Sequence, residues 1–394
     1  MLNEWLGANI IDMNRCVHFE RCSGCSLDLR KESYDENSLF FAQAFAFFKA
    51  CGMEDFKIHS GAFIGFRTRA KLAIRGDVGR IQIGMFEGRS HQILEIPYCQ
   101  VQHPRINQAV SILQSWLNEQ GFSAYQETTG QGLFRYVQLT ISEQEKIQLA
   151  LALNCEDPIE AKLGLALQRF WAQHENLFHS IWLNFNVRRD NVIFGEAWTL
   201  FSGETWMWQT FLSRAVAFHP ASFMQANPAM FEQLLQRLQG FIPEESIIAE
   251  FYAGGGTIGL TLLDRAKRID FNEIDSVAHA CFQASCSILP EDSRSKLSFV
   301  VGKAGSSDIL NQHDVELVIV DPPRKGLDKK LLDNIIDADS VKQLIYISCG
   351  FESFKRDANH LLKAGFSLKS AEAFLFFPGT DHLEILAVFG RNAP

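Results

Sequence analysis

The sequence predicts an α/β protein in which a Rossmann-like domain follows an N-terminal and central α+β domain. Beyond about residue 206, strand-like and helix-like segments alternate regularly, and a glycine-rich loop separates the first such strand from its helix. Before that point the segments are shorter, less regular and rich in aromatic residues. The length of 394 residues also favours two domains, which we place at residues 1–205 and 206–394.

The composition is that of a globular protein, with 47% hydrophobic and 21% charged residues. No apolar run approaches the roughly 20 residues that a membrane helix needs. The first residues lack the basic and apolar regions of a secretory signal, so we expect a cytoplasmic protein with neither a membrane nor an obligate protein partner. The net charge of −9 argues against a generally basic nucleic-acid-binding surface but allows a local basic patch.

The first domain contains two helix-like and several strand-like patterns. Residues 38–52 carry apolar side chains at near-helical spacing, and Gly52 can end this helix. A second helix is expected at residues 104–120, with Gly121 at its end. Alternating residue types predict strands at residues 69–74, 80–84, 134–141, 148–154, 180–187 and 191–198. This pattern is typical of an α+β domain with an antiparallel sheet.

The second domain has the order of segments found around nucleotide-type cofactors. We expect strands at residues 246–252, 268–272, 297–301, 317–320 and 344–347, and helices at residues 228–240, 258–266 and 278–286. The glycine loop follows the first of these strands, and an acidic residue ends the second. This order predicts a ligand site beside the loop.

The loop Ala253-Gly254-Gly255-Gly256-Thr257 indicates which cofactor the site takes. Its glycines let the backbone approach a ligand, and Glu273 can accept hydrogen bonds from ribose hydroxyls, with Asp275 as the alternative. The loop does not fit a dinucleotide-binding glycine frame, and no phosphate-binding Gly-Lys-Ser/Thr motif is present. It suits S-adenosylmethionine, which has no phosphates, although turns favour glycine in any case.

Two short motifs near the C-terminus place a carboxylate and a thiol after neighbouring strands. Asp321-Pro322-Pro323-Arg324 and Ser348-Cys349-Gly350 each follow an apolar run. If these strands are parallel neighbours, both loops open at one edge of the sheet, where such sheets bind ligands. The alternatives are a rigid turn with a capping Asp for the first motif and a small buried hydrophobe for the cysteine.

Four of the nine cysteines are clustered or suggestively placed: Cys16, Cys22, Cys25 and Cys99. In a reducing compartment such thiols suggest metal binding or catalysis rather than disulfides. Gly24 lets the loop between two of them wrap an ion. Tetrahedral zinc and an iron–sulfur cluster both remain open, and so does a chance grouping of cysteines.

From Cys16 to about residue 389 the chain resembles the bacterial RNA uracil-5-methyltransferases, which make 5-methyluridine in tRNA and 23S ribosomal RNA. The resemblance rests on the four cysteines, the glycine loop, Glu273, Ser348-Cys349 and three longer motifs. Those motifs are Ser222-Phe223-Met224-Gln225-Ala226-Asn227, Asp321-Pro322-Pro323-Arg324-Lys325-Gly326 and Phe377-Pro378-Gly379-Thr380-Asp381-His382-Leu383-Glu384.

The resemblance implies a role for each matching position. Cys16, Cys22, Cys25 and Cys99 match the ligands of a [4Fe–4S] cluster, and Gln225, Tyr252, Glu273 and Asp321 match residues that bind S-adenosylmethionine. Cys349 matches the nucleophile and Glu384 the general base. The reaction needs a partly ionised thiol, so we expect polar or electropositive surroundings for Cys349.

The chain departs from the family pattern at three places. Gly350 stands where the family has Asn after the cysteine, and Gly379 stands where it often has His. A small RNA-binding barrel, found at the start of some members, is not expected in the roughly 15 residues before the cysteines. Its absence resembles the branch that methylates 23S ribosomal RNA, which we therefore favour over tRNA as substrate.

An RNA-facing segment and two rival functions complete the expectations. Residues 65–71 contain three cations and Phe66, which suits RNA contact as well as a solvated edge strand. One rival is an amino-methyltransferase that uses an Asp-Pro-Pro loop without a cysteine nucleophile. The other is a non-catalytic RNA- or metal-binding protein with the same fold.

Overall fold

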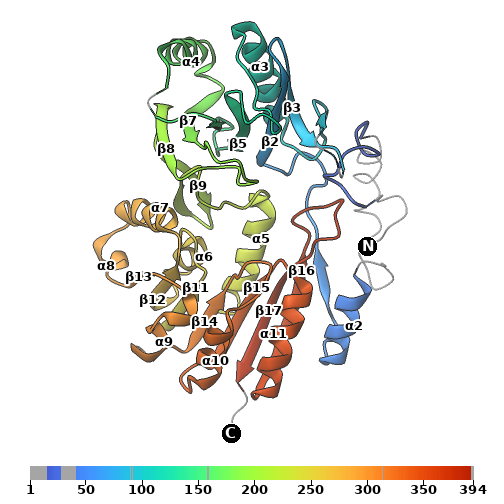
Figure 1. Ribbon diagram of the computed structural model, residues 1–394. Coiled ribbons are helices and arrows are strands. Elements are labelled where there is room, and N and C mark those ends of the chain that lie inside the picture. Colours follow the sequence, from blue (N-terminus) through green and yellow to red (C-terminus); the bar gives the residue numbers. More distant parts are fainter. Residues whose placement is uncertain are drawn as a thin grey trace. The chain divides into compact units, whose positions relative to one another are not determined.

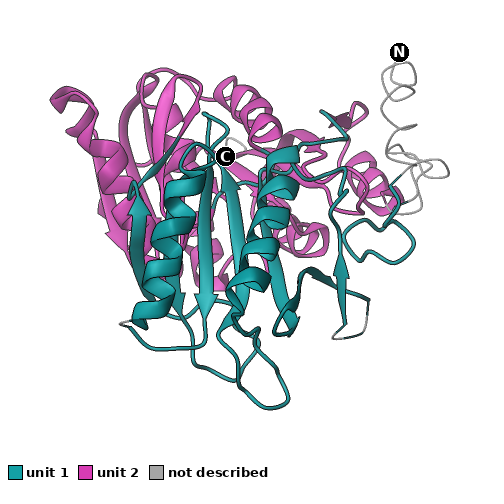
Figure 2. Cartoon of the chain, turned by 90° about the horizontal axis from the view of Figure 1, so that it is seen from above, with its two compact units in different colours: residues 1–30, 62–208, 224–227 teal, residues 31–61, 209–223, 228–394 magenta. Residues whose placement is uncertain are grey.

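The computed structural model describes residues 16–27, 41–88, 90, 92–157, 159–312 and 314–391 (Figure 1). The chain forms two compact units, which Figure 2 distinguishes by colour. Unit 1 contains Met1–Arg30, Ala62–Trp208 and Met224–Asn227, and unit 2 contains Lys31–Gly61, Gln209–Phe223 and Pro228–Pro394. Three segments thus group differently from the two predicted domains: Lys31–Gly61 with unit 2, and residues 206–208 and Met224–Asn227 with unit 1.

Unit 1 is built on a seven-stranded sheet with the order β4-β3-β2-β5-β6-β7-β8. Its strands are β2 (Arg69–Asp77), β3 (Arg80–Phe86), β4 (Ile93–Glu95), β5 (Phe134–Ile141), β6 (Ile147–Leu153), β7 (Phe178–Phe185) and β8 (Ala197–Gly203). Two helices, α3 (Pro104–Gln120) and α4 (Ala161–His174), contribute to its apolar core. In that core Trp116 of α3 and Phe170 of α4 lie 4.9 Å apart between ring centroids.

Helix α3 has the predicted bounds because both of its ends carry local signals. His103 accepts a hydrogen bond from the Arg105 N–H, and Pro104 occupies the first turn, where its missing N–H costs nothing. At the other end Gly121 adopts a left-handed φ of 65°, which glycine tolerates best. Expectation and structure therefore agree for this helix.

The sheet of unit 1 is mixed, so the expectation of an antiparallel sheet was wrong at one pairing. β6 and β7 run parallel, because α4 connects them as a crossover helix that the sequence analysis missed. The predicted strand at residues 191–198 was also wrong, since β8 starts at Ala197. The preceding segment satisfies its backbone through side chains instead: the Asn184 amide binds both the N–H and the C=O of Gly195.

Unit 2 contains an eight-stranded sheet with the order β1-β16-β17-β15-β14-β11-β12-β13. The strands are β1 (Lys57–His59), β11 (Ser246–Phe251), β12 (Ala266–Glu273), β13 (Leu297–Val301), β14 (Leu317–Val320), β15 (Gln343–Ser348), β16 (Phe366–Phe374) and β17 (Glu384–Arg391). Its helices are α2 (Ala42–Ala50), α5 (Pro228–Gln239), α6 (Thr257–Thr261), α7 (Ser276–Ser287), α8 (Glu291–Arg294), α9 (Ile309–Gln312), α10 (Lys329–Asp337) and α11 (Phe351–Lys363). A separate hairpin consists of β9 (Met207–Phe211) and β10 (Arg214–Phe218).

The strands that carry the two C-terminal motifs pair as predicted. β14 runs parallel to both β11 and β15, with Val320 opposite Tyr346. The loops that follow β14 and β15 therefore open at the same edge of the sheet. β17 runs antiparallel to β15 and to β16 and so begins at this same edge.

Helix α6 is shorter than the predicted segment 258–266, which was wrong beyond Thr261. The chain turns there through bonds from Leu262 to Gly259 and from Arg265 to Leu262, and β12 already begins at Ala266. Of the helix expected at 38–52, residues 38–40 lie outside the described residues and α2 covers Ala42–Ala50. No helix in the described ranges has the length and apolarity needed to cross a membrane.

A buried carboxylate connects three elements of unit 2. Glu372 of β16 accepts a hydrogen bond from Nε2 of His59 in β1 at 2.6 Å and forms an ion pair with Arg237 of α5. Burial alone would raise the pKa of Glu372, but the hydrogen bonds from Arg237 and His59 hold it below its ordinary value. This contact stabilises the β1 edge of the sheet, where Lys57 lies opposite Glu372.

We expect Glu372→Gln to lower the free energy of unfolding by about 1–2 kcal/mol, because Arg237 and His59, both partly exposed, lose the buried carboxylate that accepts their hydrogen bonds. Since the folded-state pKa is lowered, this stability is present above the ordinary glutamate pKa and is lost as the pH falls through the folded value. Urea unfolding at about pH 7 and about pH 3 should show the difference shrinking in acid. The exposed Glu196→Gln is the control; an equal loss there, or a loss independent of pH, contradicts the account.

Candidate active site

Three strand ends bring Asp321, Cys349 and Glu384 to one edge of the sheet in unit 2. Asp321 follows β14, Cys349 follows β15, and Glu384 is the first residue of β17. Ser348 pairs with Ile385 across β15 and β17, so Cys349 and Glu384 each stand one residue further along this register. The structure thus places the predicted nucleophile and the predicted base beside each other.

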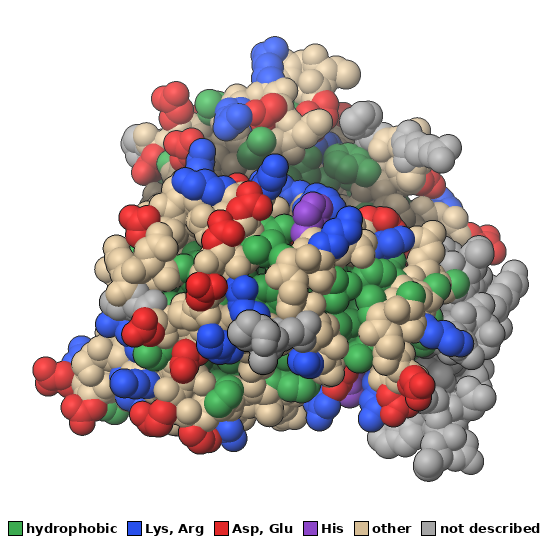
Figure 3. Space-filling view, turned by 90° about the horizontal axis from the view of Figure 1, so that it is seen from below, with side chains coloured by type: hydrophobic (Ala, Val, Ile, Leu, Met, Phe, Trp, Pro, Cys, Tyr) green, Lys and Arg blue, Asp and Glu red, His purple; other side chains and the backbone are tan. Residues whose placement is uncertain are grey.

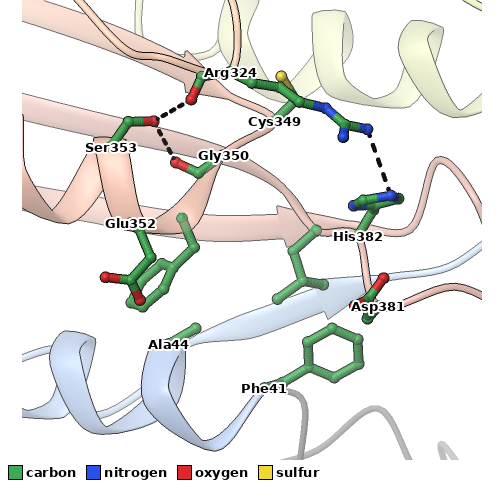
Figure 4. Close-up of a pocket in the computed structure, with 11 residues that line it drawn as sticks. Phe41, Ala44, Arg324, Cys349, Gly350, Glu352, Ser353, Asp381 and His382 are labelled. Atoms are coloured by element: carbon green, nitrogen blue, oxygen red, sulfur yellow. Dashed lines mark hydrogen bonds between the residues drawn. The ribbon is translucent and has the colours of Figure 1, made fainter.

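A pocket of about 330 Å³ adjoins Cys349 (Figure 4). The loop after β14 contributes Arg324, and the segment before β17 contributes Asp381, His382 and Leu383. The start of α11 and two residues at α2, Phe41 and Ala44, form the rest of its lining. In Figure 4 the Arg324 side chain extends past the Cys349 sulfur toward His382, with 3.4 Å between Nη2 of Arg324 and Nε2 of His382.

The thiol of Cys349 lies in acidic surroundings, which corrects the expectation of a setting that favours the thiolate. Burial, Glu384 and Asp321 raise its pKa to about 11, and the Arg324 guanidinium acts in the opposite direction. At neutral pH the thiol of the protein without substrate is therefore protonated. Any nucleophilic use of this sulfur requires a group that accepts its proton.

The two carboxyl groups beside the thiol also have raised pKa values. Burial raises the pKa of Asp321 to about 7. Burial and the nearby Asp321 raise the pKa of Glu384 well above its ordinary value, and Arg324 counteracts this shift. Because these groups interact, the ionisation of the thiol depends on the protonation of the two carboxyl groups beside it.

The glycine loop after β11 leaves open space beside its backbone. A Cβ added to Gly254 would meet no atom within 4 Å, whereas one on Gly256 would lie 2.8 Å from the Phe282 ring. Both glycines have a positive φ, and Tyr252 adopts one as well, at 59°. The loop can therefore approach a ligand on one side while it packs tightly on the other.

Glu273 and Asp275, the two predicted ribose acceptors, both accept hydrogen bonds from backbone N–H groups near the glycine loop. The Glu273 carboxylate accepts N–H bonds from Gly254 at 3.0 Å and from Ile274 at 2.7 Å. Asp275 instead caps helix α7 through the N–H of Val277. The Tyr252 hydroxyl accepts the N–H of Asp328 at 2.9 Å, which ties the glycine loop to the loop after β14.

Sequence reasoning missed Glu250, a fully buried acid in the middle of β11. Its Oε2 accepts the N–H of Gly259 at 2.7 Å, and its Oε1 has no hydrogen-bond partner among the described residues. Burial, together with Asp321 and Glu273, raises its pKa to about 8. An acid inside the apolar run Ile247-Ile248-Ala249-Glu250-Phe251 was the available signal, because such a position needs a polar partner.

Gln225, the fourth predicted cofactor residue, belongs to unit 1 rather than unit 2. Its segment is held by Thr68, whose backbone N–H donates to the Ala226 carbonyl at 2.8 Å and whose hydroxyl donates to the same oxygen at 3.3 Å. Gln225 is half-buried. The local fold of unit 1 therefore sets its position.

The four predicted cluster ligands Cys16, Cys22, Cys25 and Cys99 all lie in unit 1 and interact with one another. Burial raises the pKa of Cys25 to about 12, and the thiols of Cys99, Cys22 and Cys16 add to this rise. Arg67 acts against it, which places a cation beside the thiols. Within the described ranges, no three potential ligands meet in a geometry that would hold a metal ion.

The predicted RNA-facing segment at residues 65–71 is more enclosed than expected. Phe66 is only 8% exposed, so its ring is not available for stacking on a base. Arg69 and Lys71 pair with β5 on one side of β2, whereas the pairing with β3 begins only at Ala73, so the alternative of an edge strand stays open for this segment. Arg69 donates to Gln138, and burial lowers its pKa to about 10; Lys71 keeps an exposed side chain near the Phe194 ring.

The charge on the surface is mixed rather than uniformly basic. Acidic and basic side chains are interspersed over the face drawn in Figure 3. This pattern agrees with the net charge of −9 and excludes a continuous basic field on that face.

Comparison of the sequence with known proteins gives RNA methyltransferases as its relatives. Residues 304–391 match the family model described as tRNA (uracil-5-)-methyltransferase. An uncharacterized RNA methyltransferase of Protochlamydia amoebophila is 37% identical over 390 residues, covering 95% of this chain and 97% of that protein. Another, from Caldanaerobacter subterraneus, is 27% identical over 395 residues, covering 95% and 84%.

A solved structure confirms the expected mixed α/β fold. The tRNA (uracil-54, C5)-methyltransferase of Pyrococcus abyssi, determined in complex with S-adenosyl-L-homocysteine, is similar with a TM-score of 0.71 and 22% sequence identity. The match covers 88% of this chain and 81% of that protein.

Proposed function

Because this chain belongs to the RNA uracil-5-methyltransferase family, we propose that it methylates carbon 5 of a uridine in 23S ribosomal RNA, with S-adenosylmethionine as donor. The observation that carries the proposal is the placement of Cys349 and Glu384 at adjoining strand ends, next to a pocket. An activated thiol and a base on two sides of one ring are what methylation at this carbon needs.

The nucleophile is required because carbon 5 of uracil is too electron-poor to attack a methyl group directly. The Cys349 sulfur forms a bond to carbon 6, and the electron pair of the 5,6 double bond moves so that carbon 5 becomes nucleophilic. One difficult step is thereby divided into easier ones. Bound S-adenosylmethionine supplies an electrophilic methyl group on a positively charged sulfur.

A base completes the reaction. Glu384 removes the proton from carbon 5, the freed electron pair restores the 5,6 double bond, and the Cys349 sulfur leaves carbon 6. A carboxylate placed for such a transfer contributes about 10²–10⁴-fold. Glu384 stands beside the cysteine in the β15–β17 register, which supports this role.

The raised pKa of Cys349 assigns a second task to the carboxyl groups. As the sulfur bonds to carbon 6, the thiol proton passes to the ionised carboxylate of Asp321, which leaves Glu384 ionised for the proton on carbon 5. Asp321, with a pKa of about 7, is partly ionised at neutral pH and so available as acceptor. The net charge of the pocket is unchanged by this transfer, but the proton moves from a group with a pKa of about 11 to one with a pKa of about 7, so formation of the bond to carbon 6 has to drive it.

In unit 2, Tyr252, Glu273 and Asp321 are the residues that we propose to hold S-adenosylmethionine; the same role for Gln225, in unit 1, stays a prediction from the family resemblance. The region fits this group in two respects: open space adjoins Gly254, and buried acids gather where a cationic ligand would lie. Glu250 Oε1, buried without a partner, is one more acceptor at this loop. The same acids would repel a phosphate-bearing cofactor.

Cys16, Cys22, Cys25 and Cys99 are proposed as the ligands of a [4Fe–4S] cluster. The donor chemistry fits, because burial and neighbouring thiols raise the pKa values of Cys22, Cys25 and Cys99, and a bound metal would stabilise the ionised forms of such thiols. We place the protein in the cytoplasm, whose reducing conditions preserve such a cluster and where these RNAs are found.

tRNA is the second candidate substrate. The name of the matching family model and that of the similar Pyrococcus abyssi enzyme favour it, whereas 23S ribosomal RNA rests on resemblance to the rRNA-methylating branch. Mass-spectrometric mapping of 5-methyluridine in both RNAs from a strain lacking the gene identifies the substrate as the RNA that loses one modified position.

We expect RNA containing 5-fluorouridine at the target position to form an adduct that survives denaturation. Glu384 cannot remove fluorine from carbon 5, so the Cys349–carbon 6 bond persists after methyl transfer. Gel electrophoresis should show the adduct with the wild type and none with Cys349→Ala. An active Cys349→Ala protein would instead indicate an amino-methyltransferase, and calorimetry that detects no S-adenosylmethionine binding would indicate a non-catalytic protein.

We expect Glu384→Gln to accumulate the methylated adduct on ordinary RNA and to turn over about 10²–10⁴-fold more slowly, since elimination lacks its base. Quench-flow sampling and mass spectrometry of the Cys349 peptide measure the adduct. Turnover at the wild-type rate would contradict the role of Glu384.

Anaerobic purification should yield a brown protein that contains iron and sulfide, and Cys25→Ser should lose both. Metal analysis and the visible absorption spectrum provide the measurement. A colourless protein with one zinc per chain would establish the other arrangement that the four thiols allow.

A further inference from the structure

The hydroxyl group of Ser353 in helix α11 contacts the loop after β14 and has no role in the reaction described above. We propose that Ser353 is a positioning residue, which holds the Arg324 loop against the loop of Cys349, and that Gly350 provides the space for this contact. The inference rests on the proposed function in one respect, the role of Cys349 as nucleophile.

Ser353 contacts both loops at once. Its Oγ lies 2.8 Å from the carbonyl oxygen of Arg324 and 2.9 Å from that of Gly350, and Figure 4 draws both contacts. On the other side of the cysteine, Ser348 accepts the N–H of Gly350 with its hydroxyl at 3.2 Å. Both neighbours of Cys349, Ser348 and Gly350, are therefore held by hydrogen bonds, and the hydroxyl that contacts Gly350 also contacts Arg324.

The same helix anchors the rest of the Arg324 loop independently. Arg356 donates to the Lys325 carbonyl at 3.0 Å, and the buried Asp357 accepts the N–H of Leu327 at 2.8 Å. Tyr346 of β15 donates its hydroxyl proton to the same Asp357 oxygen at 2.9 Å. Loss of the Ser353 hydroxyl should thus leave the loop docked and change only the part that carries Arg324.

Gly350 explains why this close approach is possible. A Cβ at this position would lie 2.8 Å from the Arg324 carbonyl oxygen and 3.0 Å from Ser353 Oγ. Its φ of −137° is one that any residue adopts, so the glycine is needed for space and not for backbone conformation. The departure from Ser-Cys-Asn at this position is therefore coupled to Ser353: any side chain at residue 350 pushes the Arg324 carbonyl away.

The position of Arg324 matters because of its charge. Glu384 of β17 and Asp321 of the loop after β14 disfavour the thiolate of Cys349, and Arg324 favours it. Glu352, Asp381 and His382 line the same pocket. A displaced guanidinium would leave the acidic groups unopposed, so the thiol would ionise less readily.

The experiment measures alkylation of Cys349 by iodoacetamide in the full-length protein, with mass spectrometry of the Cys349 peptide, from about pH 7 to about pH 10. We expect Ser353→Ala to slow alkylation about three- to tenfold at about pH 8, as a rise of roughly half to one unit in the pKa of Cys349 would. The curve of alkylation rate against pH should move to higher pH. Ser353→Thr, which keeps the hydroxyl, should restore the wild-type profile. Gly350→Ala should act like Ser353→Ala, and the double variant should be no slower than either single one, because one contact is lost in each.

Ser287→Ala is the matched control. Ser287 is an exposed helix residue whose hydroxyl binds a carbonyl of its own helix, and its removal should leave the profile unchanged. Thermal unfolding of each variant identifies any that is misfolded. A folded Ser353→Ala protein with the wild-type profile, or a failure of Ser353→Thr to restore it, overturns the proposal.

The outcome is separable from that of the proposed function. An absent 5-fluorouridine adduct in the wild type would reject Cys349 as nucleophile while a displaced alkylation profile still supported the contact. An adduct in the wild type combined with unchanged alkylation in the variants would reject the Ser353 contact alone.

Discussion

The register of three neighbouring strands is the constraint on which the candidate site depends. β14 and β15 run parallel and deliver their following loops to one edge, and β17 begins at that edge because it runs antiparallel to β15. Since side chains alternate between the faces of a sheet, a slip of one residue in β17 would turn Glu384 to the opposite face. Burial of Ile385, Leu386 and Ala387 opposes such a slip, so the apolar core maintains the arrangement of the polar groups.

This arrangement places several acidic side chains in a buried region, where their ionised forms are unfavourable. Burial raises the pKa of Glu250, Asp321 and Glu384, and the nearby Asp321 adds to the rise at Glu250 and at Glu384. The acids Asp321 and Glu384 in turn disfavour the thiolate of Cys349. Arg324 is the cation that offsets this charge at the thiol, and α11 holds its loop through three successive contacts. The helix that follows the nucleophile thus also places the cation that acts on it.

The sequence predicted those elements whose signals are local. Helix α3 carries its own cap, proline and terminal glycine, and the partly exposed strand β13 and the buried strand β14 are short apolar or alternating runs with clear ends. Helix α4 was missed although Leu163, Leu167 and Phe170 recur at helical spacing, and with it the parallel pairing of β6 and β7. The strand predicted at residues 191–198 was wrong for a non-local reason. Side-chain amides of Asn184 in β7 and of Asn186 just after it bind the backbone of this segment, and no pattern within the segment reveals these bonds.

For the candidate site, too, the sequence determined some properties and the tertiary structure others. Sequence alone determined the chemical groups, because a thiol after one apolar strand, an Asp-Pro-Pro turn after another and an acid before a third can be recognised from residue order. Only the tertiary structure decided the ionisation of these groups, the burial of Phe66 and Arg69, and the contact among Gly350, Ser353 and Arg324. Each of these depends on how many atoms from distant segments surround a group, and on the removal of water by those atoms. A pKa or a steric contact is a property of that packed environment, which residue order specifies only through the complete fold.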